Sequence, residues 1–77
     1  MQKEYENLAN AIVQQAVKDY RKALLYLHRH PDCSAYRENV CELENFFRSE
    51  WIHMLTDLDG TWIMDKVRKA VKWEVLA

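Results

Sequence analysis

Residues 4–29 form an amphipathic stretch without glycine or proline, and this stretch constrains the fold most strongly. Its apolar side chains recur at steps of three and four, which places them on one face of an α-helix. They are Tyr5, Leu8, Ala9, Ile12, Val13, Ala16, Val17, Tyr20, Leu24 and Leu27. The spacing therefore predicts one long helix over 4–29. The helix should end before Pro31, because the residue that precedes a proline is disfavoured in the helical conformation.

A second helix is expected to begin after Asp32 or Ser34, since either residue suits an N-cap position. Its apolar positions again follow steps of three and four, and they are Tyr36, Val40, Leu43, Phe46 and Phe47. Two continuations are compatible with the sequence. The helix either runs on through Leu55 with a bend, or it breaks at Ser49, which would then cap a short separate helix. We favour the bent, nearly continuous helix.

Residues 56–60 are expected to form a turn, with Asp57 or Asp59 as the N-cap of a last helix that runs to about Trp73. The expected core residues of this helix are Ile63, Val67, Ala70, Val71 and Val75. The sequence contains no alternating strand pattern and no hairpin turn. We therefore predict an all-α protein with one domain over residues 1–77. It should be a small antiparallel bundle of three helices, or of four if the chain breaks at Ser49.

Composition and length limit the partners and the location that the chain is expected to have. A chain of 77 residues supports a limited core, and 49% of its residues are hydrophobic, which together favour a homo-oligomer. The net charge of −1 gives no basic excess for binding nucleic acid, so this function is disfavoured. No apolar run reaches the roughly 18 residues that a membrane span needs. Residues 1–5 do not resemble a signal peptide. We therefore expect a cytoplasmic protein without a membrane partner.

Metal binding is not expected. The candidate ligands His28, His30, Cys33 and Cys41 lack the paired spacing of a zinc site. The segment that begins at Asp57 resembles the start of a calcium loop. However, its twelfth position is Arg68, where such a loop needs a glutamate. We therefore predict neither a metal nor any other cofactor.

Catalysis is also not expected. His53 lies three residues after Glu50 and four before Asp57, and helical spacing brings such pairs together. A histidine held by a carboxylate can act as a general base. The sequence nevertheless shows no partnered nucleophile, and its single glycine cannot build a phosphate-binding loop. The prediction is a protein that is not an enzyme.

A second stripe on the last helix combines tryptophan with lysine: Trp62, Lys66, Lys69 and Trp73 follow at steps of four, three and four. Aromatic rings interleaved with cations suit base stacking and phosphate contacts, and they also suit a subunit interface. We favour the interface. If the stripe is exposed, it becomes a site for a partner or a ligand. The ligand-binding residues would then be Arg48, Trp51, Trp62, Lys66 and Lys69.

A DNA-binding alternative uses the helix, turn and helix expected over residues 36–71. Lys66, Lys69 and Lys72 would then lie on the helix that enters the major groove. The turn is longer than the tight turn of helix-turn-helix proteins, and the net charge is negative. The alternative is a small DNA-binding regulator.

Four segments resemble a known family: Glu6–Val13, Gln15–Arg21, Phe46–Trp51 and Leu55–Gly60. The chain resembles short, uncharacterised helical proteins of phages and mobile elements in Gram-positive bacteria, and the similarity covers almost its whole length. The resemblance transfers no residue role. It implies a phage accessory protein in the cytoplasm of a host cell. Such a protein would counteract a bacterial anti-phage defence system, either by sequestering a nucleotide-like signal or by occluding a defence protein.

Overall fold

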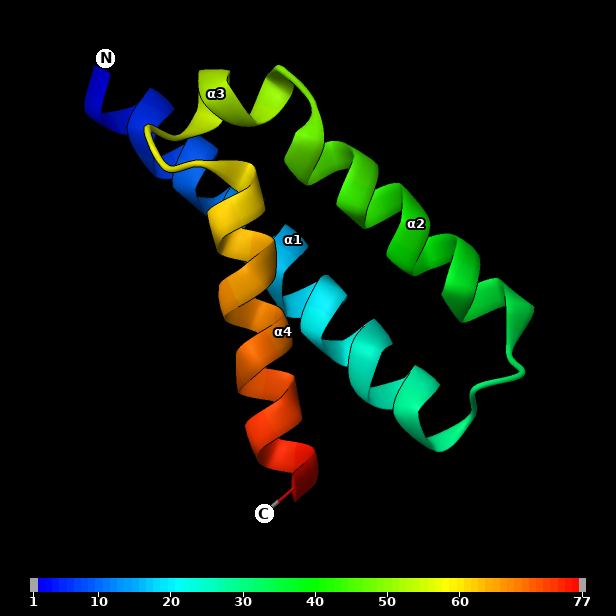
Figure 1. Ribbon diagram of the computed structural model, residues 1–77. Helices are drawn as coiled ribbons and strands as arrows, with labels where there is room; N and C mark the ends of the chain where they lie inside the picture. Colours follow the sequence, from blue (N-terminus) through cyan, green and yellow to red (C-terminus); the bar gives the residue numbers. More distant parts are fainter. Residues whose placement is uncertain (1, 77) are drawn as a thin grey trace.

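The protein is all-helical in the residues that its structure describes. The computed structural model describes the backbone of residues 2–76 and the side chains of residues 7–75. The helices are α1 (Gln2–Arg29), α2 (Ser34–Arg48), α3 (Trp51–Leu55) and α4 (Gly60–Leu76). α2 returns antiparallel to α1, α3 forms a corner at the end of α2, and α4 crosses α1 obliquely (Figure 1). The predicted all-α class is therefore confirmed, with four helices packed together in the described residues.

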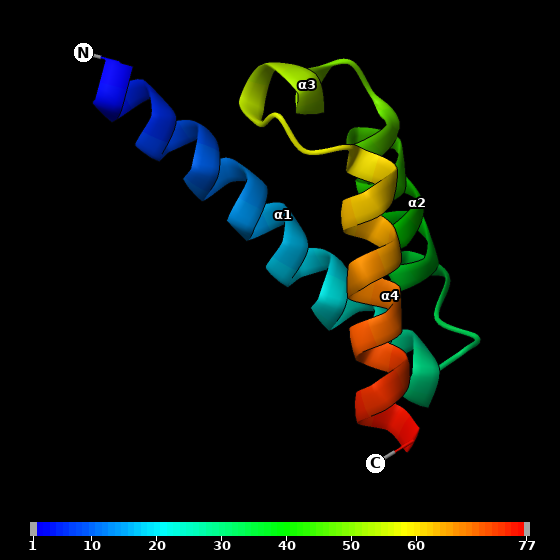
Figure 2. The same ribbon diagram turned by 60° about the vertical axis from the view of Figure 1, so that its left-hand side comes forward.

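The N-terminal half of α1 extends away from α2 and α4. These two helices lie beside the C-terminal half of α1 (Figure 2). Of the apolar face predicted for α1, Leu8 and Ile12 are consequently 60% and 41% exposed. The side chain of Tyr5 lies outside the described residues. Periodicity in a sequence identifies the apolar face of a helix, but it does not show how far neighbouring helices cover that face.

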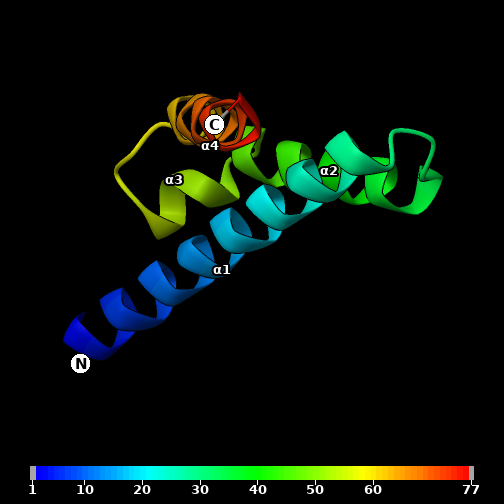
Figure 3. The same cartoon turned by 90° about the horizontal axis from the view of Figure 1, so that it is seen from below.

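The core lies where α1, α2 and α4 meet, with α4 resting across the other two helices (Figure 3). Its fully buried large side chains are Tyr20, Phe47 and Ile52, contributed by α1, α2 and α3. α4 adds Ile63, Met64, Val67 and Val71. The prediction that Ala70 belongs to the core is wrong, because Ala70 is exposed and Met64 is buried in addition to the expected residues. Helical spacing places Met64 closer than Ala70 to the middle of the buried side of α4.

The chain breaks at Ser49, so the bent continuous helix that we favoured is wrong and the alternative of a separate helix is correct. Ser49 has an extended backbone, with ψ of 166°. Its N–H and its hydroxyl both donate to the carbonyl of Phe46, at 3.2 and 2.7 Å. These bonds satisfy a carbonyl at the end of α2. Ser49 therefore ends α2, whereas Glu50 precedes α3 without a side-chain cap.

The start of α2 also differs from the prediction. Its N-cap is Cys33, which makes no side-chain cap hydrogen bond, in place of the expected Asp32 or Ser34. The N–H of Cys33 donates to the carbonyl of His30 at 3.1 Å and closes the turn around Pro31. This turn leaves Asp32 one residue too early to cap the helix and places Ser34 inside it.

The start of α4 agrees with the prediction. The side chain of Asp59 accepts hydrogen bonds from the N–H and the hydroxyl of Thr61, at 3.0 and 2.7 Å. The bond from the hydroxyl, followed by the bond from the backbone, lowers the pKa of Asp59 because both stabilise the carboxylate. Asp59 is therefore the cap, and Asp57 is not. α4 continues to Leu76, three residues beyond the predicted end.

Gly60 marks the closest approach between α4 and the end of α2. A Cβ atom at this position would lie 1.7 Å from the carbonyl oxygen of Phe47 and 3.2 Å from Ile52 Cγ2. The φ angle of Gly60 is not positive, so steric space rather than backbone conformation requires glycine here. The absence of a side chain allows α4 to begin against α2 over the buried Ile52.

We predict that Gly60→Ala destabilises the fold by about 2 kcal/mol or more, because the added methyl group displaces α4 from α2. Without this contact, alanine would be the better helix former by up to about 1 kcal/mol. The sign of the change in the free energy of unfolding, measured by urea unfolding, therefore shows which of the two effects is larger. Lys72→Ala, an exposed substitution on the same helix, should change the free energy of unfolding by less than about 0.5 kcal/mol. A stabilised Gly60→Ala variant would contradict the packing described here.

Candidate binding surface

The tryptophan–lysine stripe lies on the side of α4 that faces away from the core. We call this surface, formed by Trp62, Lys66, Lys69 and Trp73, the outer face of α4. The side chains of Trp62 and Trp73 are 50% and 76% exposed. They are eleven positions apart in the helix, which corresponds to about 16 Å along the axis. The stripe is therefore exposed in the single chain, which is the condition under which it becomes a candidate site.

Two lysines on this face have defined neighbours. Lys66 Nζ lies 5.4 Å from the centroid of the Trp62 ring, within the range of a cation–π contact. Lys69 Nζ lies 3.0 Å from Asp65 Oδ2, one helical turn earlier. Both partners of this ion pair are exposed, so the pair adds little stability. Its main effect is to bring a negative charge to the edge of an otherwise cationic face.

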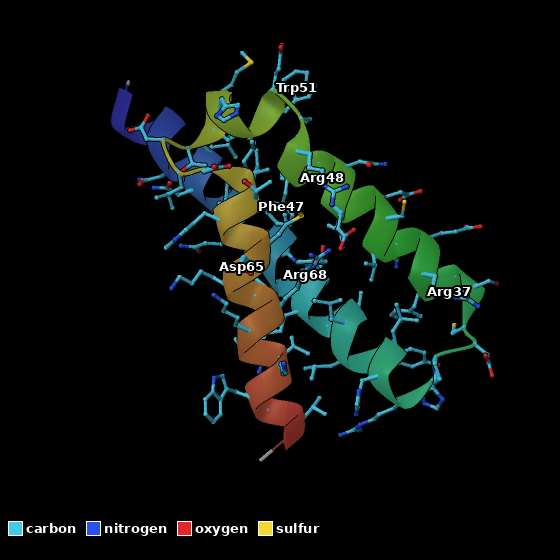
Figure 4. All side chains as sticks on the ribbon, in the orientation of Figure 1. Arg37, Phe47, Arg48, Trp51, Asp65 and Arg68 are labelled. Carbon is cyan, nitrogen blue, oxygen red and sulfur yellow. The ribbon has the colours of Figure 1, made fainter. Side chains whose placement is uncertain are left out.

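The other two predicted residues, Arg48 and Trp51, lie elsewhere. Arg48 is the last residue of α2 and Trp51 the first residue of α3. Figure 4 shows Trp51 at the corner between these helices, pointing away from α4. Both side chains are exposed, Trp51 by 65%. The predicted set of five residues is therefore divided into two groups, and only Trp62, Lys66 and Lys69 share a face.

None of these five residues lines any of the four main clefts of the described part of the chain. The largest of these four clefts, of about 710 Å³, lies at the C-terminal ends of α1 and α4. A small ligand is normally held in a concave site that buries most of its surface. The outer face of α4 lies outside these four concave sites.

A polar cluster that the sequence did not indicate joins α1, α2 and α4. The hydroxyl of Tyr20 donates to Glu44 Oε2 at 2.7 Å and accepts from Arg68 Nε at 2.8 Å. Arg68 Nη2 donates to the same carboxylate oxygen. Figure 4 places Arg68 on the side of α4 that faces α2. The position of Tyr20 on the apolar face of α1 could have suggested such a cluster, because a buried tyrosine usually needs a partner for its hydroxyl.

The cluster changes the titration of its members. Burial, followed by the hydrogen bond to Glu44, raises the pKa of Tyr20 to about 12. Burial acts to raise the pKa of Glu44, but the hydrogen bonds from Tyr20 and Arg68 outweigh it, with help from the charges of Arg68 and Arg48. The pKa of Glu44 is therefore lowered, and the carboxylate is ionised at neutral pH. The cluster faces other helices of the same chain, so its role is structural.

Of the residues considered for catalysis, His53 and Asp57 line the same cleft, which has a volume of about 480 Å³. His53 is exposed, and the described side chains include no hydrogen bond between His53 and Asp57. Residues 7–75 contain no group of three or more His, Cys, Asp or Glu side chains that could hold a metal ion. Cys33 and Cys41 are both free thiols.

Comparison with known proteins yielded no match: no protein-family model, no curated protein and no solved structure is recognisably similar to this chain. Within the described residues, no helix combines the length and the apolar character that crossing a bilayer requires.

We predict that Glu44→Gln lowers the free energy of unfolding at pH 7 by about 1.5 kcal/mol, because the charge-assisted bonds to Tyr20 and Arg68 weaken. The pKa of Glu44 is lower in the folded state than its ordinary value of 4.5. Its contribution is therefore present above pH 4.5 and lost as the pH falls below that value. Urea unfolding from pH 3 to 7 measures this loss.

The matched control is Glu42→Gln, which removes the same charge from an exposed position of α2. The control should retain the acid-induced loss of stability seen in the unmodified chain, whereas Glu44→Gln should show less of it. Equal acid sensitivity of the two variants would show that Glu44 does not stabilise the fold through its charge.

Proposed function

We propose that this chain is a non-enzymatic binding protein that covers the surface of a partner protein with the outer face of α4. One observation carries the proposal: Trp62 and Trp73 are 50% and 76% exposed on one side of a helix whose other side is packed in the core. Tryptophan is among the residues that contribute most binding energy in protein interfaces. Two indoles about 16 Å apart can anchor both ends of a small interface.

The shape of the face favours a protein over a nucleotide-like signal at these residues. A ligand of nucleotide size needs groups that converge around it. Here Arg48 and Trp51 lie at another corner, and no cleft among the four main ones includes Trp62 or its neighbours. A protein partner can supply the missing concave surface itself. We therefore favour occlusion of a protein over sequestration of a signal as the role of this face.

The chemistry of the face defines the partner. It should present apolar pockets for the two indoles and carboxylates near Lys66 and Lys69. Lys66 already lies over the Trp62 ring, so less side-chain entropy is lost when it pairs with an acid. The resemblance to phage proteins makes a bacterial anti-phage defence protein the proposed partner, in the cytoplasm of the host cell.

The DNA-binding alternative stays a prediction. Lys66, Lys69 and Lys72 are all exposed, as a recognition helix would require. Two observations favour a protein partner over DNA. Lys69 is paired with Asp65. In addition, the segment before α4 is a helix of only five residues, which is short for the first helix of a helix-turn-helix unit.

We predict that Trp73→Ala and Trp62→Ala each weaken partner binding by at least about thirtyfold, the loss expected for a hot-spot residue of about 2 kcal/mol. The partner is first captured from a host lysate with the tagged chain, identified by mass spectrometry and purified. Calorimetry then measures the affinity of each variant. Leu8→Ala is the control, because it removes a large apolar side chain, 60% exposed, that lies on α1 and outside both the outer face of α4 and the α2–α3 corner. If it weakens binding as much as Trp73→Ala, the outer face of α4 is not the binding surface.

Self-association is a second proposal, and a different group of exposed apolar side chains favours it. Trp51, Met54 and Leu58, from α3 and the turn after it, are 65%, 64% and 50% exposed. A small domain with a limited core gains stability when such side chains are buried between subunits. We propose a homo-oligomer that forms through this corner and leaves the outer face of α4 available.

We predict that the unmodified chain sediments as an oligomer and that Trp51→Ala combined with Met54→Ala sediments as a monomer at the same concentration. Sedimentation velocity measures the mass. Trp73→Ala should remain oligomeric. If Trp73→Ala dissociates and the double variant does not, the outer face of α4 is the subunit interface, and both proposals are wrong.

A further inference from the structure

We propose that the cleft at the C-terminal ends of α1 and α4 binds a nucleoside phosphate, with its phosphates near Lys22 and Arg29 and its base stacked on His30. This inference goes beyond the proposed function, because it concerns a different surface and a different class of ligand. No residue of the outer face of α4 takes part, so either proposal can fail alone.

The cleft has a suitable size and position. Its volume of about 710 Å³ lies within the range of about 300–1,000 Å³ that is common for small-ligand sites. α1 and α4 end at the same end of the molecule (Figure 1). Most of the lining comes from the C-terminal part of α1, and the rest comes from His30, directly after α1, and from the end of α4. The lining residues are Lys22, Leu25, Tyr26, His28, Arg29, His30, Glu74 and Val75.

The charge of the cleft is positive although the chain as a whole carries −1. Among the described side chains, neither Lys22 nor Arg29 forms an ion pair. The one acid in the lining, Glu74, is already paired with Arg21. The carbonyl end of α1 contributes about half a negative charge, which two full cations exceed. His28 and His30 add two further nitrogen donors. An anion is therefore the ligand that this lining favours.

An aromatic stack beside the cations indicates a second property of the ligand. The rings of Tyr26 and Tyr36 are stacked, with centroids 4.0 Å apart and planes 19° apart. The His30 ring lies 4.5 Å from the Tyr26 ring, at 33°. Tyr26 is thus in contact with a second ring from α2, which restrains its orientation. Tyr26 lies between the rings of Tyr36 and His30, and His30 is exposed, so the ring surface that remains available in the cleft is that of His30.

Cations beside an exposed aromatic stack match a ligand that has both phosphates and a flat ring. Lys22 and Arg29 supply the charge-assisted hydrogen bonds that phosphate oxygens accept. A nucleobase can extend the stack, an interaction worth about 1–3 kcal/mol per base in nucleic-acid complexes. An inorganic phosphate satisfies only the first requirement and a free nucleoside only the second. The combination favours a nucleoside phosphate.

The experiment is a titration followed by ¹H–¹⁵N NMR, with ATP, pyrophosphate and adenosine as probes at one ionic strength. ATP should shift the amide signals of residues 22–30 and 74–75. Pyrophosphate and adenosine should each bind at least about tenfold more weakly than ATP, because each lacks one of the two contacts. Lys22→Ala and Arg29→Ala should each weaken ATP binding by about tenfold.

Two variants separate a built site from general attraction. Lys66→Ala removes the same charge from the outer face of α4 and should leave the affinity for ATP unchanged. His30→Ala should weaken ATP binding by about fivefold or more and leave the affinity for pyrophosphate unchanged. All four substitutions are at exposed positions, and the amide spectrum of each variant checks that it is folded.

Several results would overturn the proposal. One is the absence of shifts at residues 22–30 at millimolar ATP. A second is a loss of affinity in Lys66→Ala equal to that in Lys22→Ala, which would show non-specific attraction. A third is adenosine binding as tightly as ATP. A fourth is a single-stranded oligonucleotide that binds more tightly than ATP and shifts signals along α4, which would identify a nucleic-acid surface instead.

Discussion

The hydroxyl of Tyr20 lies at the point where three helices of this small protein meet. It donates to Glu44 from α2 and accepts from Arg68 of α4, while its ring is fully buried beside Phe47. Apolar contacts alone would permit several crossing angles between short helices, since burial has no strong direction. A hydrogen bond requires defined distances and angles. The Tyr20 cluster therefore contributes to the specificity of the arrangement as well as to its stability.

The position of α4 follows from three contacts along its length. Gly60 places its first turn against the carbonyl of Phe47, Arg68 fixes its middle, and Glu74 pairs with Arg21 of α1 near its end. Together these contacts restrict the rotation of α4 about its own axis. That rotation determines which side chains face solvent. The exposure of the two indoles is therefore a consequence of well-packed contacts on the opposite side, and it places them on a rigid element.

Features that depend on local spacing could be predicted from the sequence. They include the long α1, an aspartate cap at residue 57 or 59, and the tryptophan–lysine stripe on a separate side of α4 from its aliphatic core residues. Features that depend on contacts between distant residues could not. Ser49 and the residues after it are all compatible with a helix. The break after α2 is favoured by a contact between distant residues, the packing of Ile52 beneath Gly60. Glu44 likewise accepts hydrogen bonds from Arg68, which is 24 residues away, although Arg48 lies only four residues along α2.

Charge shows the same difference between what local sequence indicates and what contacts between distant residues determine. The net value of −1 argued against binding nucleic acid, yet it is an average over the whole chain. Glu44 and Glu74 are paired with arginines that join helices, so their charges are compensated at those positions. Lys22 and Arg29 have no such partner among the described side chains. The potential in a cleft depends on which charges are compensated nearby, because screening limits the range of the others to about 10 Å. A chain close to neutrality can therefore carry a cationic cleft, and its position follows from the ion pairs that fold the protein.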